Sequence, residues 1–272
     1  KKRTKTRKRS NKRNSKRNTN NKRNSKKTNK RARSRKTDNK IVDVPFSRTR
    51  SKGTYASSGG IHFHYQNYSN VMNYLKSLNI TNACFFKNRE AFLNLNIDKH
   101  DMSVKTMGLD QNLFLSDLRE CLKTSKRFIP IILNLATKDG NHANILLIDK
   151  QNERIELYEP HGSRKSDSVL GSVKGAYSKK IKELKKFWRS ILPEFNVVNM
   201  VDYRRGTHFQ LEYDPENNSG FCVTWSILFT HYRLLNPDVK PDTLIKYLSK
   251  KITTVKLLQY AKYVEESIKH KV

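Results

Sequence analysis

The chain has 272 residues, of which 56 are Lys or Arg and 24 are Asp or Glu, and its net charge is +32. No apolar run approaches the roughly 20 residues that a membrane-spanning helix needs, and no secretory signal is visible. The sequence therefore predicts a protein without a membrane span, and its positive charge favours polyanionic partners.

Residues 1–40 form a basic tail. They hold 21 Lys or Arg and a single acid, Asp38, so this segment alone carries a charge of +20. The motif Asn-Lys-Arg-Asn-Ser-Lys occurs at 11–16 and again at 21–26. Such a segment cannot bury enough apolar surface to offset the entropy of ordering it, so we expect it to be disordered. Its charge indicates nucleic-acid binding or nuclear import, and a solubilising tail is the simpler alternative.

The rest of the chain has the composition of a globular body. Residues 41–127 contain two stretches, 68–78 and 111–124, whose apolar residues recur at helical spacing. We expect residues 41–127 to be a helical N-terminal part that is accessory to a core formed by residues 128–272. About 230 residues fit one such domain.

Three short apolar runs follow at 128–135, 142–148 and 154–158, and polar turns join them. Successive short strands with tight turns are typical of an antiparallel meander. His142 would begin the second strand, and Glu159 would follow the third. Adjacent antiparallel strands would bring these two positions close together.

The last hundred residues predict helices and one further strand. The helix expected at 222–235 is apolar on most faces and should be buried. Cys222 would be its first residue, where the partial positive charge of a helix N-terminus favours the thiolate. The other expected elements are helices at 175–192, 241–250 and 253–269 and a strand at 195–200.

The three cysteines, Cys84, Cys121 and Cys222, include no CxxC pair and are odd in number. They favour a reducing compartment without a disulfide framework, and Cys121 falls on the apolar face of its predicted helix. No spacing of Cys and His indicates zinc. The polar run 98–101 is more typical of a solvent-exposed loop than of a metal site, so no metal or other cofactor is expected.

His142, Glu159 and Cys222 are, in this order, the parts needed for nucleophilic acyl transfer. The thiolate would attack a carbonyl, the imidazole would take or share its proton, and the carboxylate would orient the imidazole. Each residue alone has a simpler explanation, as a small core side chain, a strand-end histidine or a turn acid. Their order, spacing and placement together favour a site. The alternatives for base or acid are His161, Asp149 and His208.

The arrangement resembles the adenovirus-type and ubiquitin-like-protein-specific cysteine proteases over about residues 128–237. Similar motifs occur in uncharacterised members from giant DNA viruses. The resemblance implies an α+β, papain-like cysteine protease fold with a central antiparallel sheet flanked by helices and the nucleophile at the N-terminus of a buried helix. The motifs are Gly140-Asn141-His142-Ala143-Asn144, Tyr158-Glu159-Pro160-His161-Gly162 and Gly220-Phe221-Cys222-x-x-Trp225-Ser226 with Arg233-Leu234-x-Asn236-Pro237.

Two positions depart from the pattern of this clan. Ala143 follows the histidine where the ubiquitin-like branch usually has Trp, which disfavours recognition of a ubiquitin-like tail. Glu216 stands where the glutamine of the oxyanion hole usually lies. The resemblance therefore moves that role to Gln210, with the backbone N–H of Cys222 as the second donor. The substitutes for Gln210 are Asn217 and Asn218.

The resemblance implies a viral cysteine endopeptidase that cleaves a viral precursor protein or a ubiquitin-like conjugate, with a slight preference for the precursor. It implies a protein substrate and an intracellular location, in the virion or in the host cytoplasm or nucleus, where residues 1–40 would meet nucleic acid. One alternative is an acetyltransferase with the same triad, which would bind acetyl-coenzyme A and an inositol phosphate on Lys179, Lys180 and Lys182. The other is a catalytically degenerate, nucleic-acid-binding virion protein, which Glu216 favours.

Overall fold

The structure is a computed structural model. It describes residues 40–52, 54–55, 61–62, 68–87, 92–97, 102–107, 111–137, 140–160, 176–200 and 221–269. The basic tail expected in residues 1–40 lies outside these ranges except for Lys40.

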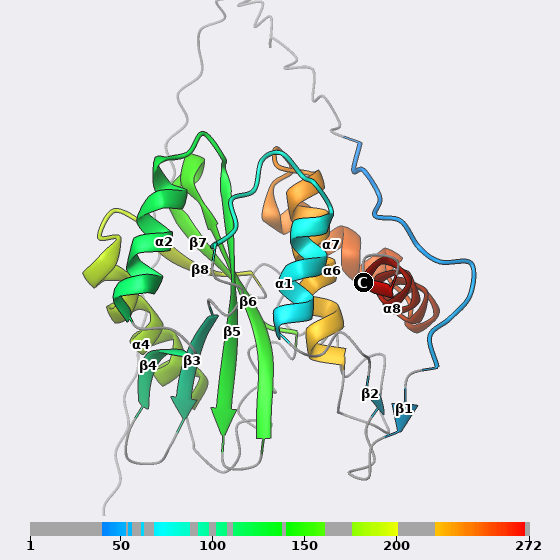
Figure 1. Cartoon of the computed structure of the whole chain (residues 1–272), viewed down its shortest axis with the longest axis horizontal. Coiled ribbons are helices and arrows are strands. Elements are labelled where there is room, and N and C mark those ends of the chain that lie inside the picture. Colours follow the sequence, from blue (N-terminus) through cyan, green and yellow to red (C-terminus); the bar gives the residue numbers. More distant parts are fainter. Residues whose placement is uncertain are drawn as a thin grey trace, which may run out of the picture. The chain divides into compact units, whose positions relative to one another are not determined.

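A mixed, six-stranded sheet runs through the described part of the chain in the order β4-β3-β5-β6-β7-β8 (Figure 1). A separate two-stranded sheet pairs β1 with β2. The bounds of the strands are β1 (Thr54–Tyr55), β2 (Ile61–His62), β3 (Phe92–Ile97), β4 (Met102–Met107), β5 (Phe128–Thr137), β6 (Gly140–Asp149), β7 (Arg154–Tyr158) and β8 (Asn196–Asn199).

The meander predicted from the sequence is the centre of this sheet. β5 pairs antiparallel with β6, so that Phe128 lies opposite Asp149 and Thr137 lies opposite Gly140. β6 pairs antiparallel with β7, so that Ile145 lies opposite Tyr158 and Asp149 lies opposite Arg154. In the six-stranded sheet, the expectation of antiparallel pairing holds for this centre and for β3 with β4. β3 lies parallel to β5 and β8 lies parallel to β7, because chain segments remote from the meander join both of its sides.

Helices cover both faces of the sheet. In Figure 1, α2 and α4 lie on one side of the sheet, and α1, α6, α7 and α8 lie on the other. The bounds of the helices are α1 (Tyr68–Ser77), α2 (Gln111–Lys123), α4 (Ala176–Ile191), α6 (Phe221–Leu235), α7 (Pro241–Lys251) and α8 (Thr254–Lys269), and a short 3-10 turn, η2 (Lys150–Asn152), joins β6 to β7. The expected α+β class, with a sheet flanked by helices, is confirmed.

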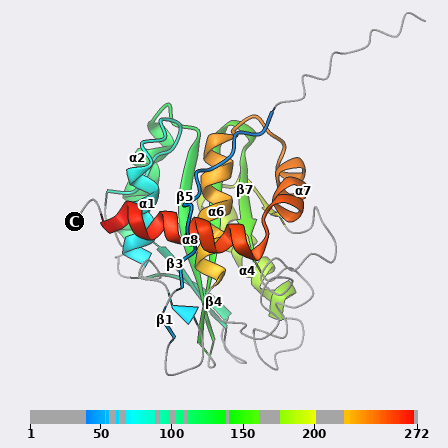
Figure 2. The ribbon, with the colours of Figure 1, turned by 90° about the vertical axis from the view of Figure 1, so that its right-hand side faces the viewer.

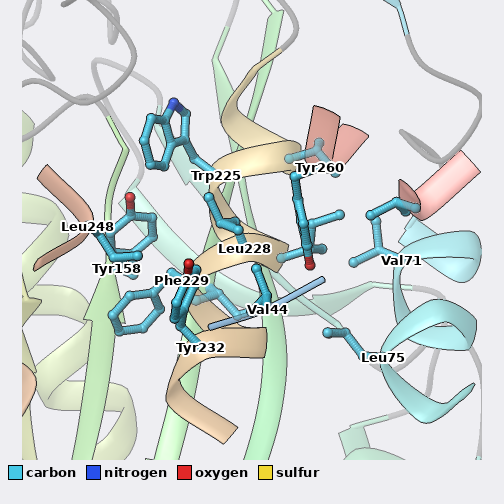
Figure 3. Close-up of a cluster of buried hydrophobic side chains, with 14 of the residues drawn as sticks. Val44, Val71, Leu75, Tyr158, Trp225, Leu228, Phe229, Tyr232, Leu248 and Tyr260 are labelled. Carbon is cyan, nitrogen blue, oxygen red and sulfur yellow. The ribbon is translucent and has the colours of Figure 1, made fainter. Parts of the chain in front are cut away.

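Helix α6 is the centre of the larger hydrophobic core (Figure 3). Arg233 is the exception among its fifteen residues, and the other fourteen are apolar, aromatic or hydroxyl-bearing. All fifteen except Cys222 and Leu235 are buried. Its Phe229 ring stacks on Tyr158 of β7 with 4.3 Å between ring centroids and an interplanar angle of 2°. α8 crosses in front of α6 in Figure 2 and contributes Tyr260 to the same core. Burial on this scale is the main stabilising contribution to such a domain.

The opposite face of the sheet buries a second core under α2 and α4. Alternate residues of one strand divide between the two cores, since successive side chains of a strand point to opposite faces. On β6, Ala143 and Ile145 face the α6 side, and Leu146 and Ile148 face the α2 side. α4 contributes Leu184 and Trp188 to this second core.

The disulfide between Cys84 and Cys121 contradicts the expectation of unpaired cysteines. The two Cα atoms lie 5.5 Å apart, and 37 positions separate the residues in the sequence. Cys121 is buried in the second core as predicted, and the segment after α1 brings Cys84 to it because Cys84 N–H bonds to the carbonyl of Phe128 at 2.8 Å. The cysteine count therefore no longer favours a reducing compartment.

Residues 41–127 were expected to be helical, but they also contain strands. Their hairpin of β3 and β4 extends the main sheet, and Leu93 of β3 is buried in the second core. The short, mixed patterns at 92–97 and 102–107 carry no helical period. Pairing makes them strands, because β3 pairs with β5 and β4 pairs with β3. The division of the chain at residues 40 and 127 stays a prediction.

Segment 40–52 holds α6 and α8 together. Asn236, just after α6, accepts a hydrogen bond from the Val42 N–H at 2.7 Å and donates one to the Val42 carbonyl at 2.9 Å. The N–H groups of Ser47 and Ser51 donate to carbonyls of α8. None of the helices that the structure describes has the length and apolar character needed to cross a membrane.

Candidate active site

His142 and Glu159 form a buried pair at the ends of neighbouring strands. His142 is the third residue of β6, and Glu159 follows the last residue of β7. The histidine Nε2 lies 2.6 Å from Oε1 of Glu159, and the side chains are 7% and 0% exposed. The contact fixes the imidazole ring, because a nitrogen that donates to a carboxylate sets both the tautomer and the orientation of the ring.

Cys222 lies in the first turn of α6 and is the free cysteine of the chain. Its side chain is half-buried and is hydrogen-bonded to the side chain of His142. Since Nε2 of His142 is bound to Glu159, Nδ1 is the ring nitrogen left for the sulfur. The prediction of a cysteine at the N-terminus of a buried helix is confirmed.

The charges of this site favour a thiolate beside an imidazolium. Burial alone would raise the pKa of the Cys222 thiol, but the hydrogen bond and the charge of His142 outweigh it. Backbone hydrogen bonds from Ala143 and Val223 act in the same direction, so the pKa of the thiol lies below its ordinary value. A thiolate, not a thiol, is the nucleophile in acyl transfer.

Burial would also lower the pKa of His142, yet this pKa is raised to about 9. The charge of Glu159 is the largest opposing cause, and the hydrogen bonds to Cys222 and Glu159 add to it. At neutral pH the imidazole therefore carries a proton that it can give to a leaving group. The triad can supply a nucleophile and a general acid at the same time.

An ion-pair network anchors the far end of α6 to the strands that carry the pair. Arg233, 0% exposed, binds Glu156 of β7 through Nε at 2.8 Å and through Nη2 at 3.1 Å. Its Nη1 donates to the carbonyls of Asn236 and Pro237, both at 3.0 Å. Arg233 therefore holds α6 against β7, which ends beside Glu159.

Asp149, an alternative acid in the sequence analysis, belongs to this network and not to the triad. It accepts hydrogen bonds from Arg127 Nε at 2.9 Å and from Arg154 Nη2 at 3.2 Å, and Arg233 Nη2 lies 3.4 Å from it. Burial would raise the pKa of Asp149, but the guanidinium of Arg127 and the amide of Asn152 hold it below its ordinary value. The carboxylate is occupied by structural partners and is unavailable to His142.

The remaining candidates lie outside the described residues. They are Gln210 with its substitutes Asn217 and Asn218, Glu216, and the alternative histidines His161 and His208. The assignment of the oxyanion role to Gln210 stays a prediction. Within the described ranges, no group of three or more His, Cys, Asp and Glu side chains is arranged to hold a metal ion.

Sequence reasoning noted Arg233 and Asn236 only as part of a motif and missed what they hold. A signal for both was present. Glu156 and Asp149 are acids inside or beside dense apolar strands, and Arg233 is a cation inside an apolar helix. Buried charges of opposite sign need one another, so such isolated charges in apolar elements indicate a buried ion pair.

Comparison with known proteins begins with the sequence. No family model matches the chain. It is 22% identical over 208 residues to L371 of Acanthamoeba polyphaga mimivirus, whose name assigns it to the ankyrin repeat proteins. The match covers 68% of this chain and 25% of L371, so the chain spans about a quarter of the length of that relative.

Similar solved structures include the pS273R protease of ASFV, with 15% identity, a TM-score of 0.41 and coverage of 80% of this chain and 71% of that one. ChlaDub1 of Chlamydia trachomatis has 12% identity and a TM-score of 0.37, over 77% of this chain and 80% of that one. The C-terminal Ulp1 protease domain in complex with Smt3, the yeast ortholog of SUMO, has 11% identity and a TM-score of 0.34, over 79% of both chains. Two of these three are named as proteases.

Proposed function

We propose that the chain is a cysteine peptidase with Cys222 as nucleophile, His142 as general acid and base, and Glu159 as the group that orients His142. The observation that carries the proposal is the continuous contact from the thiol through the imidazole to the carboxylate, with 2.6 Å between His142 Nε2 and Glu159 Oε1. Burying a His–Glu pair costs desolvation energy, and groups with perturbed pKa values cluster at functional sites. Here the pair contacts a thiol that can react.

The reaction follows from these groups. The Cys222 sulfur forms a bond to the substrate carbonyl carbon, and the protonated His142 gives its proton to the leaving amine as the carbon–nitrogen bond breaks. Water then attacks the thioester while neutral His142 takes its proton. The carbon–sulfur bond breaks, the acid product leaves, and the Cys222 thiolate and protonated His142 are restored. The backbone N–H of Cys222 and the side chain of Gln210 are the proposed donors to the oxyanion.

For the substrate we favour a viral precursor protein over a ubiquitin-like conjugate. Ala143, which stands where the ubiquitin-like branch has Trp, is 4% exposed and belongs to the core around α6. Its carbonyl accepts a hydrogen bond from Ser226 Oγ of α6 at 3.4 Å. A bulky aromatic ring at this position would displace α6, so a lid over a substrate tail has no room here.

The basic tail would localise the proposed peptidase on nucleic acid. Residues 1–40 carry +20 and would bind nucleic acid without sequence specificity, with an affinity that falls steeply with salt. The proposed peptidase would then work beside a genome, inside a virion or in the cytoplasm or nucleus of a host cell.

Cleavage of a proteome-derived peptide library tests the proposed reaction. Purified full-length chain, its Cys222→Ala variant and its His142→Ala variant are each incubated with the library, and new termini are counted by mass spectrometry. Termini that require both residues support a peptidase. In a parallel incubation with labelled acetyl-coenzyme A, a labelled Cys222 without cleavage would instead establish the acetyltransferase. A thiol of ordinary reactivity, with neither product, would establish the degenerate virion protein.

A further inference from the structure

The outward side of α4 carries an exposed row of cations. Lys182, Lys185, Lys186 and Arg189 are all exposed, and together with Ile181 they line a hollow of about 510 Å³. The helix holds six Lys or Arg and one acid, Glu183. This is the densest positive charge on any helix that the structure describes.

The spacing of these residues places them on one side of the helix. Positions 182, 185, 186 and 189 recur at intervals of three and four, so their side chains are neighbours. Seven residues of an α-helix rise about 10 Å, so four positive charges lie within that length. Leu184 and Trp188, on the other side of α4, are buried in the second core. Their burial fixes the cationic side outward.

Nothing among the described residues neutralises the row. None of its four cations forms an ion pair with another described residue, whereas Lys246 of α7 lies 3.5 Å from Asp242 and Lys262 of α8 lies 3.8 Å from Glu266. Like charges on one side of a helix repel each other. A concentration of unneutralised charge of one sign is an electrostatic footprint for a polyanion.

The side chains around the row decide which polyanion fits. A helix that binds the membrane surface exposes large apolar side chains beside its cations. The exposed large apolar residues among those described are Val42, Leu113 and Val255, and none of them lies on α4. A protein partner would favour aromatic residues and Arg over Lys at the centre of the contact. Three of the four cations here are Lys, which binds phosphate as a point charge without the geometric demand of the Arg fork.

We propose that this side of α4 binds the phosphate backbone of nucleic acid without sequence specificity. The site is separate from the triad, since α4 packs on the face of the sheet opposite α6 (Figure 1). The proposal does not rest on the peptidase, because Cys222, His142 and Glu159 take no part in it.

Matched charge variants of the full chain test the proposal. The first replaces Lys182, Lys185, Lys186 and Arg189 with Gln. The second replaces four exposed lysines elsewhere, Lys123, Lys250, Lys251 and Lys269, with Gln, so that both lose the same formal charge. Gln is nearly as good a helix former as Lys and Arg, so both variants should keep the unfolding midpoint of the wild type. Binding of a random-sequence DNA duplex is measured by fluorescence anisotropy over a range of salt concentrations.

The plot of log K against log salt has a slope of about 0.9 per neutralised phosphate. We expect the α4 variant to lose about 3 in the magnitude of this slope, and the control variant to lose less than about 1. Equal slopes for the two variants would overturn the proposal. So would an α4 variant that binds DNA as the wild type does but no longer binds vesicles of anionic lipid or polyglutamate. Neither result depends on Cys222, and a Cys222→Ala chain should bind DNA unchanged.

Discussion

Arg233 and Glu156 join the last turn of α6 to β7 through two hydrogen bonds, at 2.8 and 3.1 Å, with both side chains 0% exposed. Cys222 lies at the other end of α6, and Glu159 lies three positions beyond Glu156. This buried ion pair therefore fixes the position of α6 along the direction of β7. The same setting determines where the sulfur stands relative to the His142–Glu159 pair.

Replacing Arg233 with Met should lower the free energy of unfolding by about 3 kcal/mol or more, because Glu156 and Asp149 keep buried charges with fewer partners. Urea unfolding of the full chain measures the change. The exposed Lys246 of α7, which pairs with Asp242, is the control, and its replacement with Met should cost less than about 1 kcal/mol. Adding Glu156→Met to the Arg233→Met variant should restore part of the loss. A loss within 1 kcal/mol for Arg233→Met alone would show that the pair does not hold α6.

Replacing Glu159 with Gln should make Cys222 less reactive at low pH. The charge of Glu159 raises the pKa of His142, so removing that charge lowers the pKa. A smaller fraction of His142 is then protonated, and the imidazolium that stabilises the Cys222 thiolate is less populated. At pH 6 we expect iodoacetamide to alkylate Cys222 roughly tenfold more slowly than in the wild type, since one pKa unit is tenfold in population. Alkylation rates from pH 5 to 10 measure the effect.

The same pair predicts how stability changes in alkaline solution. The pKa of His142 is raised from 6.5 to about 9 in the folded chain, so the folded state binds the proton more tightly. The resulting stabilisation is complete below about pH 6.5 and is lost as pH rises through about 9. The Glu159→Gln variant should lose less stability over this range. An unchanged alkylation profile together with unchanged alkaline stability would separate Glu159 from the chemistry of His142.

His231 predicts a loss of stability in acid. It is buried on α6, its Nδ1 lies 3.3 Å from the Tyr74 hydroxyl and 3.1 Å from the Tyr260 hydroxyl, and burial lowers its pKa from 6.5 to about 4. The unfolded chain therefore binds a proton that the folded chain does not. Stability should fall as pH drops from about 6.5 towards 4, by up to about 3 kcal/mol.

Urea unfolding at pH 7.5 and 4.5 measures this difference for the wild type and for a His231→Gln variant. The variant starts from a lower stability at pH 7.5, but the part of its acid loss that comes from His231 should be absent. If both proteins lose the same stability between the two pH values, protonation of His231 is not the cause.

The Cys84–Cys121 disulfide should stabilise the chain by about 4 kcal/mol, because it closes a loop of 37 residues in the unfolded state. The Cys84→Ser, Cys121→Ser double variant should unfold at a correspondingly lower urea concentration, and reduction of the wild type by dithiothreitol should reproduce the shift. A Cys222→Ser variant is the control and should unfold as the oxidised wild type does. No shift on reduction would mean that the bond is absent from the protein in solution.

Local patterns in the sequence were sufficient for the six helices and for β5 to β8, but not for β3 and β4. The expected strand 154–158 is β7 to the residue, and the expected helix 222–235 is α6 extended by one residue at its start. Helical and strand periods are properties of ten or so consecutive residues, so they survive without knowledge of the fold. For the same reason the sequence placed His142 near the start of a strand and Cys222 in the first turn of a helix.

Contacts between distant segments were decided by the tertiary structure alone. The parallel positions of β3 and β8, the Cys84–Cys121 bond and the Arg233–Glu156 pair each join residues more than thirty positions apart. No local period records such neighbours, because they are chosen by which faces and charges must be buried together. The lowered pKa of Cys222 belongs to this second group: residue type and helix position favour it, but the imidazole that outweighs the effect of burial comes from β6, a distant segment of the chain.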